Sequence, residues 1–186
     1  MEGNAVYAFS RLGFARHPST RRLAEALIEW QWPDGGWNCD RHRTAHRSSF
    51  HESVTPALGL ATYTNQTGDT AALVAAVRTA ELLLQHRLFR VHGTGEPIHP
   101  SWTKPHYPPY WHYDVLQGLR LLRAVDRLND RRASDALDLL ESSRRRDGTF
   151  SGPQWSSKDQ PAVLDRGTYN QMLTRRAQEI LEASGR

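Results

Sequence analysis

Residues 31–37, which read Gln-Trp-Pro-Asp-Gly-Gly-Trp, constrain the fold more than any other part of this sequence. They follow an amphipathic helical pattern, and Pro33 ends that helix because proline has no N–H to continue its hydrogen bonds. The two glycines supply a turn, since glycine tolerates positive φ angles. Trp37 can then fold back between helices, and Gln31 can bond backbone groups that the helix end leaves free. The segment therefore predicts a helical hairpin closed by a packed tryptophan.

Helical periodicity continues along the chain, and no segment has a convincing strand pattern. The predicted helices pair into hairpins at about 4–37, 48–89 and 112–150, and a terminal helix follows at about 167–184. Each hairpin ends in a turn that carries an aromatic residue, which indicates an internal repeat. We therefore expect residues 1–186 to form a single all-α domain of repeated helical hairpins.

Three local predictions refine this outline. Ser19 is expected to cap the second helix, because serine favours the N-cap position. In the turn of the third hairpin, Arg145 is expected to stand where the first hairpin has its glutamine. The loop at 90–111 is long for a compact domain and rich in proline and aromatic residues, so we expect an ordered cover packed on the helices.

The composition argues against several classes of protein. No apolar run is long enough to span a membrane, and the N-terminus carries no signal-peptide pattern. A single cysteine rules out an internal disulfide, so we expect a cytoplasmic protein. The formal net charge of +4 is typical of a solvated basic surface, and the sequence has no nucleic-acid reading motif. No nucleic-acid partner is therefore expected.

The motifs resemble a known superfamily. The turn at 31–37 is similar to the QW repeat of squalene/terpene cyclases and of protein prenyltransferase β subunits. Further segments look like those of uncharacterised bacterial squalene-cyclase-like proteins, in the same order, at 34–39, 48–51, 87–90, 110–116 and 144–150. The resemblance implies an α/α toroid, in which an inner ring of helices lies inside an outer ring. Because a closed toroid has about twice as many hairpins, it implies a partial barrel that corresponds to the C-terminal half of those proteins.

Cys39, His51 and His112 are the candidate metal ligands. Cys39 follows the glycine-rich turn, and each histidine opens an inner helix of the implied toroid, where such positions converge at one mouth. Prenyltransferase β subunits likewise hold zinc with an Asp, a Cys and a His from successive inner helices. Thiolate and imidazole ligands suit zinc, and Asp114 can complete or orient the set. The resemblance thus implies a structural zinc site, and the alternative is a buried free cysteine with histidines that cap helix ends.

Two functions follow from these features. The sequence lacks both the Asp-X-Asp-Asp acid of class II cyclases and the Asp-rich diphosphate motif of class I enzymes. This favours a non-catalytic helical-repeat scaffold that binds a protein partner or a second copy of itself, with or without structural zinc. The alternative is an isoprenoid-binding or isoprenoid-transforming enzyme, or a remnant of one, because the aromatic loop and a concave face suit an apolar small molecule.

Overall fold

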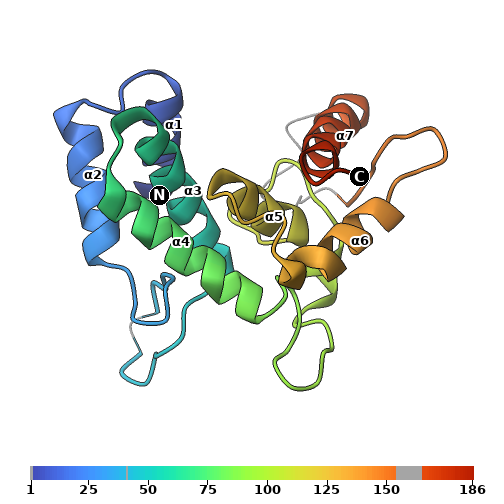
Figure 1. The fold of residues 1–186 in the computed structure, drawn as a ribbon, viewed down its shortest axis with the longest axis horizontal. Helices are drawn as coiled ribbons and strands as arrows, with labels where there is room; N and C mark the ends of the chain where they lie inside the picture. Colours follow the sequence, from blue (N-terminus) through green and yellow to red (C-terminus); the bar gives the residue numbers. More distant parts are fainter. Residues whose placement is uncertain (1, 41, 154–164) are drawn as a thin grey trace. The chain divides into compact units, whose positions relative to one another are not determined.

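The computed structural model describes residues 2–40, 42–153 and 165–186. In these ranges the chain forms seven α-helices, two short 3₁₀ helices and no strand, which confirms the all-α class (Figure 1). Among the described residues, no helix combines the length and apolar character needed to cross a bilayer. The elements are α1 (Glu2–Arg11), α2 (Pro18–Glu29), α3 (Phe50–Thr67), α4 (Thr70–Gln85), η1 (Pro100–Thr103), α5 (Val115–Ala124), η2 (Arg131–Ala133), α6 (Ser134–Ser142) and α7 (Arg166–Ala183).

The chain divides into two compact units. The first comprises Met1–Leu83 with Ala124–Arg127, and the second comprises Leu84–Arg123 with Leu128–Arg186. The range of each predicted hairpin contains two α-helices, namely α1 and α2, α3 and α4, and α5 and α6, and α7 lies in the range of the terminal helix. The arrangement of these hairpins as a toroid stays a prediction.

In the first unit, α1 packs mainly on α3. Two glycines allow this close approach, because a Cβ on Gly59 would lie 2.7 Å from the carbonyl oxygen of Gly3. A Cβ on Gly3 would in turn lie 2.6 Å from the backbone nitrogen of Pro56, inside α3. Val6 and Leu60, at 0% exposure, are part of the resulting core.

The start of α2 differs from the prediction. The N-cap is His17 and not Ser19, and the ring Nδ1 of His17 accepts the backbone N–H of Ser19 at 3.2 Å. Pro18 holds the first helical position, where its missing N–H costs nothing. The first N–H in need of a partner therefore belongs to Ser19, and the histidine two residues earlier reaches it. The same His-Pro-Ser arrangement starts η1, where His99 Nδ1 accepts the N–H of the serine at 3.2 Å.

The turn at 31–37 forms as predicted. Gly35 takes a φ of 98°, and the turn closes through hydrogen bonds from Trp32 N to Gly36 O at 2.8 Å and from Gly35 N to Trp32 O at 2.9 Å. Trp37 is 7% exposed, and its indole Nε1 donates to the carbonyl of Leu27 in α2 at 2.9 Å. The packed tryptophan is therefore confirmed.

Gln31 ties this turn to α4. Its Nε2 donates to Gly35 O at 2.9 Å and to Ala75 O at 2.8 Å, and Thr79 Oγ1 lies 3.3 Å away. Its Oε1 accepts from Arg78 NH1 at 2.9 Å. The glutamine was expected to bond backbone groups, and it bonds carbonyls of the turn and of α4 rather than those at the end of its own helix.

The turn after α6 repeats this hydrogen-bond pattern. Arg145 N donates to Thr149 O and Gly148 N donates to Arg145 O, both at 2.9 Å, and Gly148 takes a φ of 80°. Arg145 therefore corresponds to Trp32, the residue after Gln31. Arg144 stands at the glutamine position, so the predicted placement of Arg145 there was wrong by one residue.

A hydroxyl on the following helix anchors the aromatic residue of each turn. In the first turn, Ser53 Oγ accepts from Trp37 N at 2.9 Å and lies 3.2 Å from Trp37 O. In the second, Thr174 Oγ1 accepts from Phe150 N at 2.8 Å and lies 3.3 Å from Phe150 O. The two turns thus share one hydrogen-bond pattern and one kind of anchor, and the internal repeat stays a prediction.

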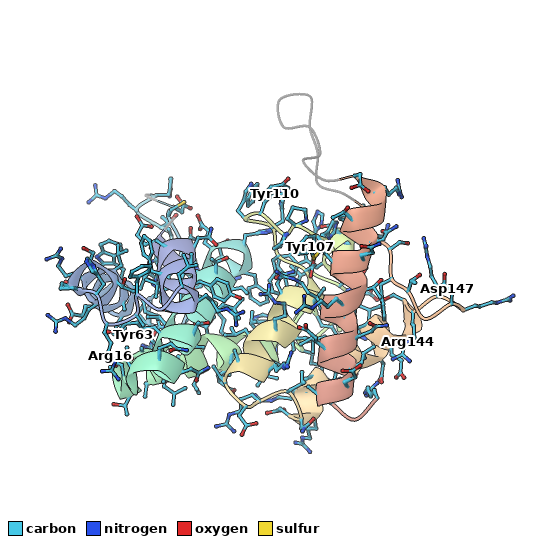
Figure 2. All side chains as sticks on the ribbon, turned by 90° about the horizontal axis from the view of Figure 1, so that it is seen from above. Arg16, Tyr63, Tyr107, Tyr110, Arg144 and Asp147 are labelled. Atoms are coloured by element: carbon cyan, nitrogen blue, oxygen red, sulfur yellow. The ribbon has the colours of Figure 1, made fainter. Side chains whose placement is uncertain are left out.

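The predicted loop cover packs down only in part. Trp102 is 7% exposed and meets the ring of Tyr113 edge to face, with centroids 4.8 Å apart. The hydroxyl of Tyr113 donates to the carbonyl of Leu88 at 2.7 Å. Tyr110 and Trp111 remain 42% and 62% exposed (Figure 2). The loop is therefore anchored through Trp102, while its last two residues remain exposed.

Candidate functional site

Each of the two units contains two of the four predicted zinc ligands. Cys39 and His51 belong to the first unit, and His112 and Asp114 belong to the second. Within the ranges that the structure describes, no three His, Cys, Asp or Glu side chains are grouped so that they could hold a metal ion. The zinc site therefore stays a prediction.

Cys39 is paired with a carboxylate. Its Sγ lies 2.5 Å from Glu52 Oε1, and its backbone N–H donates to Glu52 Oε2 at 3.1 Å. The hydrogen bond to Glu52, together with the negative charge of that side chain, raises the pKa of the Cys39 thiol. The thiol form is therefore favoured, whereas a metal would need the thiolate. The side chain is exposed, so the expectation of a buried free cysteine was wrong.

Asp114 has a structural role at the start of α5. Its Oδ1 accepts the N–H of Gln117 at 3.1 Å, and its Oδ2 accepts the N–H of His106 at 2.8 Å. The ring Nδ1 of His106 lies 3.2 Å from the same Oδ2, and both side chains are buried. His112 lies two residues before Asp114 and packs against Trp111, with ring centroids 3.9 Å apart. Asp114 thus caps a helix and holds the loop down.

A different group of residues forms the candidate site. A cavity of about 870 Å³ lies within the second unit. It is lined by Leu84, Gln85, His86, Arg87, Arg90, Val91, His92, Gly93, Thr94, Gly95, Arg131, Arg132 and Ser134. Four of these residues are arginines and none is acidic. The sequence did not reveal the cavity, because its arginines come from two segments, 87–90 and 131–132, that are distant along the chain.

A strained turn presents the first pair of arginines. Arg87 and Leu88 take φ angles of 44° and 69°, which cost about 1–3 kcal/mol each for residues other than glycine. The N–H of Arg90 donates to His86 O at 2.7 Å, and the hydroxyl of Tyr113 holds the carbonyl of Leu88. The turn is therefore fixed on both sides, and such strain is typical of functional sites.

An aspartate from α6 holds this first pair. Arg90 Nε donates to Asp135 Oδ2 at 2.7 Å, and Arg90 NH1 donates to the carbonyl of Gly95 at 2.7 Å. Arg87 NH1 is 3.4 Å from the same Oδ2, and its side chain is 60% exposed. Arg90 is thus held at two points, whereas Arg87 is held loosely at one.

The second pair of arginines lies on η2. Asp130 caps this element, and its carboxylate receives Arg132 Nε at 3.0 Å and Arg132 NH2 at 2.8 Å. Arg131 is exposed. Neither Asp130 nor Asp135 lines the cavity, although each pairs with an arginine that does.

The chain has no match among known proteins: no protein-family model, no curated protein and no solved structure corresponds to it. What the cavity can bind therefore follows from its own residues. Its lining contains four guanidinium groups and no acidic side chain. Its walls are thus suited to an anion.

Proposed function

We propose that this chain is a helical-hairpin scaffold, without catalytic activity, that binds an anionic small molecule in the arginine-lined cavity of its second unit. The observation that carries this proposal is the gathering of four arginines, and no acidic residue, around one cavity. Guanidinium groups bind carboxylates and phosphates through paired hydrogen bonds. A cavity of about 870 Å³ is also within the usual size of a small-molecule site.

Titration with inorganic pyrophosphate tests the proposal. We expect saturable binding in isothermal titration calorimetry at low ionic strength, and weaker binding as salt is added, because the attraction is screened. Arg87→Gln and Arg131→Gln should each weaken binding by about tenfold, since each removes charged hydrogen bonds. Arg144→Gln is the matched control, because this exposed arginine lies in the same unit on the turn after α6 (Figure 2). Absence of saturable binding at low salt would rule out the proposal.

A second candidate function, binding of a protein partner or a second copy, is favoured by the turn after α1. Phe14 N donates to Phe9 O at 2.8 Å and Gly13 N donates to Ser10 O at 3.3 Å, as in a Schellman motif. The apolar side chains of this turn are exposed by 41% at Phe9, 68% at Leu12 and 55% at Phe14. Such a cluster on a soluble surface is typical of an interaction site.

Light scattering tests whether the turn after α1 binds a second copy of the chain. A dimer at high concentration that becomes monomeric in the Leu12→Ser, Phe14→Ser double variant would support self-association through this turn. A monomer in both proteins would contradict it. Val74→Ser on α4 is the control, because Val74 is also exposed, by 59%, but lies outside the turn.

The isoprenoid-binding or isoprenoid-transforming alternative stays a prediction. Leu84 and Val91 are the apolar side chains among the cavity lining, and charged or polar groups supply most of the rest. We therefore expect an uncharged isoprenoid alcohol to bind more weakly than pyrophosphate. The reverse order in the same calorimetric titration would favour the isoprenoid alternative.

A further inference from the structure

We infer that the turn after α1 binds the surface of a lipid bilayer that contains anionic phospholipids. Three exposed apolar side chains form the apolar tip of this turn: Phe9 in the last turn of α1, and Leu12 and Phe14 between α1 and α2. Exposed arginines flank this tip along the chain. The inference does not rest on anion binding in the cavity, because the turn belongs to the first unit and the cavity to the second.

The backbone fixes the apolar tip in its exposed position. Phe14 N donates to Phe9 O at 2.8 Å, and this bond of the Schellman motif brings the backbones of the two phenylalanines together. Gly13 takes a φ of 88°, which glycine adopts without strain. His17 N donates to Phe14 O at 3.0 Å, and Ala15, at 3% exposure, is the residue of the turn that faces the core. The exposed side chains are therefore held outward by a turn that its own hydrogen bonds close.

Open space surrounds the apolar tip. A Cβ built on Gly13 would have no heavy atom of the described residues within 4 Å, apart from those of its chain neighbours, and Leu12 is 68% exposed. A protein partner would have to offer a groove of matching shape, whereas the fluid interface of a bilayer admits a projecting apolar group of any shape. Leucine and phenylalanine are among the residues that interfacial segments bury in this way. The shape of the tip therefore favours a bilayer over a protein surface.

The charge around the apolar tip is positive. Residues 3–24 contain four arginines and no acidic residue. Arg21 lies 3.6 Å from Glu25, but neither Arg11 nor Arg16 pairs with a carboxylate of the described residues, and Arg16 reaches only a backbone carbonyl, at 3.4 Å. A second copy of the chain would bring the same charges against one another, whereas anionic headgroups neutralise them. The charge therefore favours an anionic lipid surface over self-association.

The two arginines without a carboxylate partner also stand close to the tip in the sequence. Arg11 directly precedes Leu12, and Arg16 follows Phe14 by two residues. A long aliphatic stem lets a guanidinium group stay at the membrane surface while the apolar groups beside it are buried. When the tip enters the boundary between headgroups and acyl chains, both guanidinium groups can therefore bind lipid phosphates and carboxylates.

Co-sedimentation with phospholipid vesicles tests this inference. One set of vesicles contains phosphatidylcholine alone, and the other contains phosphatidylcholine and phosphatidylserine in equal parts. At low ionic strength, we expect the protein to bind the mixed vesicles on the order of tenfold more tightly than the neutral ones, because two exposed arginines meet anionic headgroups. Added salt should weaken this binding, since it screens the charges. Absence of binding to the mixed vesicles at low salt would overturn the inference.

A double variant of the tip and a double variant of the arginines separate the two contributions. Leu12→Ser with Phe14→Ser removes apolar groups that enter the bilayer, so it should weaken binding to the mixed vesicles by about tenfold or more. Arg11→Gln with Arg16→Gln keeps the tip, so it should remove most of the preference for phosphatidylserine. Val74→Ser is the control for the tip, because Val74 is exposed but lies outside the turn.

Arg43→Gln with Arg47→Gln is the matched control for the arginines. Both residues are exposed and belong to the first unit, but they precede α3, whereas Arg16 contacts the carbonyl of Gln66 near the end of α3 (Figure 1). We expect this control to keep the preference for phosphatidylserine. An equal loss in both arginine variants would show a general attraction of positive charge to the vesicles, and it would overturn the assignment to the turn.

Two further outcomes separate this inference from the other proposals. Arg87→Gln removes an arginine of the cavity and should leave vesicle binding unchanged, so pyrophosphate binding can fail while lipid binding stands. A dimer that the Leu12→Ser, Phe14→Ser variant dissociates, in a protein that binds neither kind of vesicle, would assign the tip to a second copy and overturn the lipid proposal. Circular dichroism of each variant confirms that lost binding does not come from unfolding.

Discussion

Replacement of Gln31 by alanine tests whether this side chain holds the turn at 31–37 in place. The side chain joins the turn at 31–37 to α4 through Nε2 bonds to Gly35 O and Ala75 O, at 2.9 and 2.8 Å, and it accepts from Arg78 NH1 at 2.9 Å. If these bonds hold the turn in place, Gln31→Ala should lower the free energy of unfolding by more than an ordinary surface substitution does.

The expected loss is about 2–3 kcal/mol, at roughly 1 kcal/mol for each of the two short Nε2 bonds and less for the exposed bond to Arg78. A larger loss is not expected, because neither carbonyl is left alone. Thr79 Oγ1 still donates to Gly35 O at 2.7 Å, and Ala75 O lies inside α4, where the helical backbone N–H four residues later bonds it. Gln31→Glu should cost at least as much, because it sets carboxylate oxygens against these two carbonyls.

Urea unfolding followed by circular dichroism measures this loss. Arg144→Ala is the matched control, since Arg144 holds the equivalent position in the second turn but bonds through its side chain to no residue that the structure describes. We expect that control to change stability by less than about 0.5 kcal/mol. Equal effects of Gln31→Ala and Arg144→Ala would refute the view that the glutamine holds the turn.

Three further predictions concern the same region. Trp37→Phe removes the indole bond to Leu27 and part of the ring volume, so it should lower the unfolding free energy by about 1–3 kcal/mol in the urea assay. Glu52→Gln removes the charged acceptor whose hydrogen bond and negative charge raise the pKa of Cys39, so that pKa should fall and iodoacetamide should alkylate the thiol faster at pH 8. An unchanged alkylation rate would contradict this cause. If zinc is bound, Cys39→Ser should release it and lower the melting temperature, whereas His42→Ala should do neither. Purified protein without zinc by elemental analysis would refute the zinc site.

Local patterns in the sequence predicted much of the helical framework. The helices, the glycine-rich turn and the buried Trp37 all follow from periodicity and backbone preferences that act over a few residues. The cap of α2 was missed because Pro18 shifts the first unsatisfied N–H to Ser19, and a histidine two residues earlier can reach it. The placement of Arg145 was wrong because the register of the turn depends on its hydrogen bonds.

The all-α class and the turn at 31–37 follow from the sequence alone, because a helical period and a glycine turn are local properties of the chain. The cavity required the fold. Arg87 and Arg90 meet Asp135 only when distant segments pack together, and the same ion pairs decide which charges remain to bind a ligand. Long-range electrostatics of this kind depends on distances in space, which periodicity does not specify.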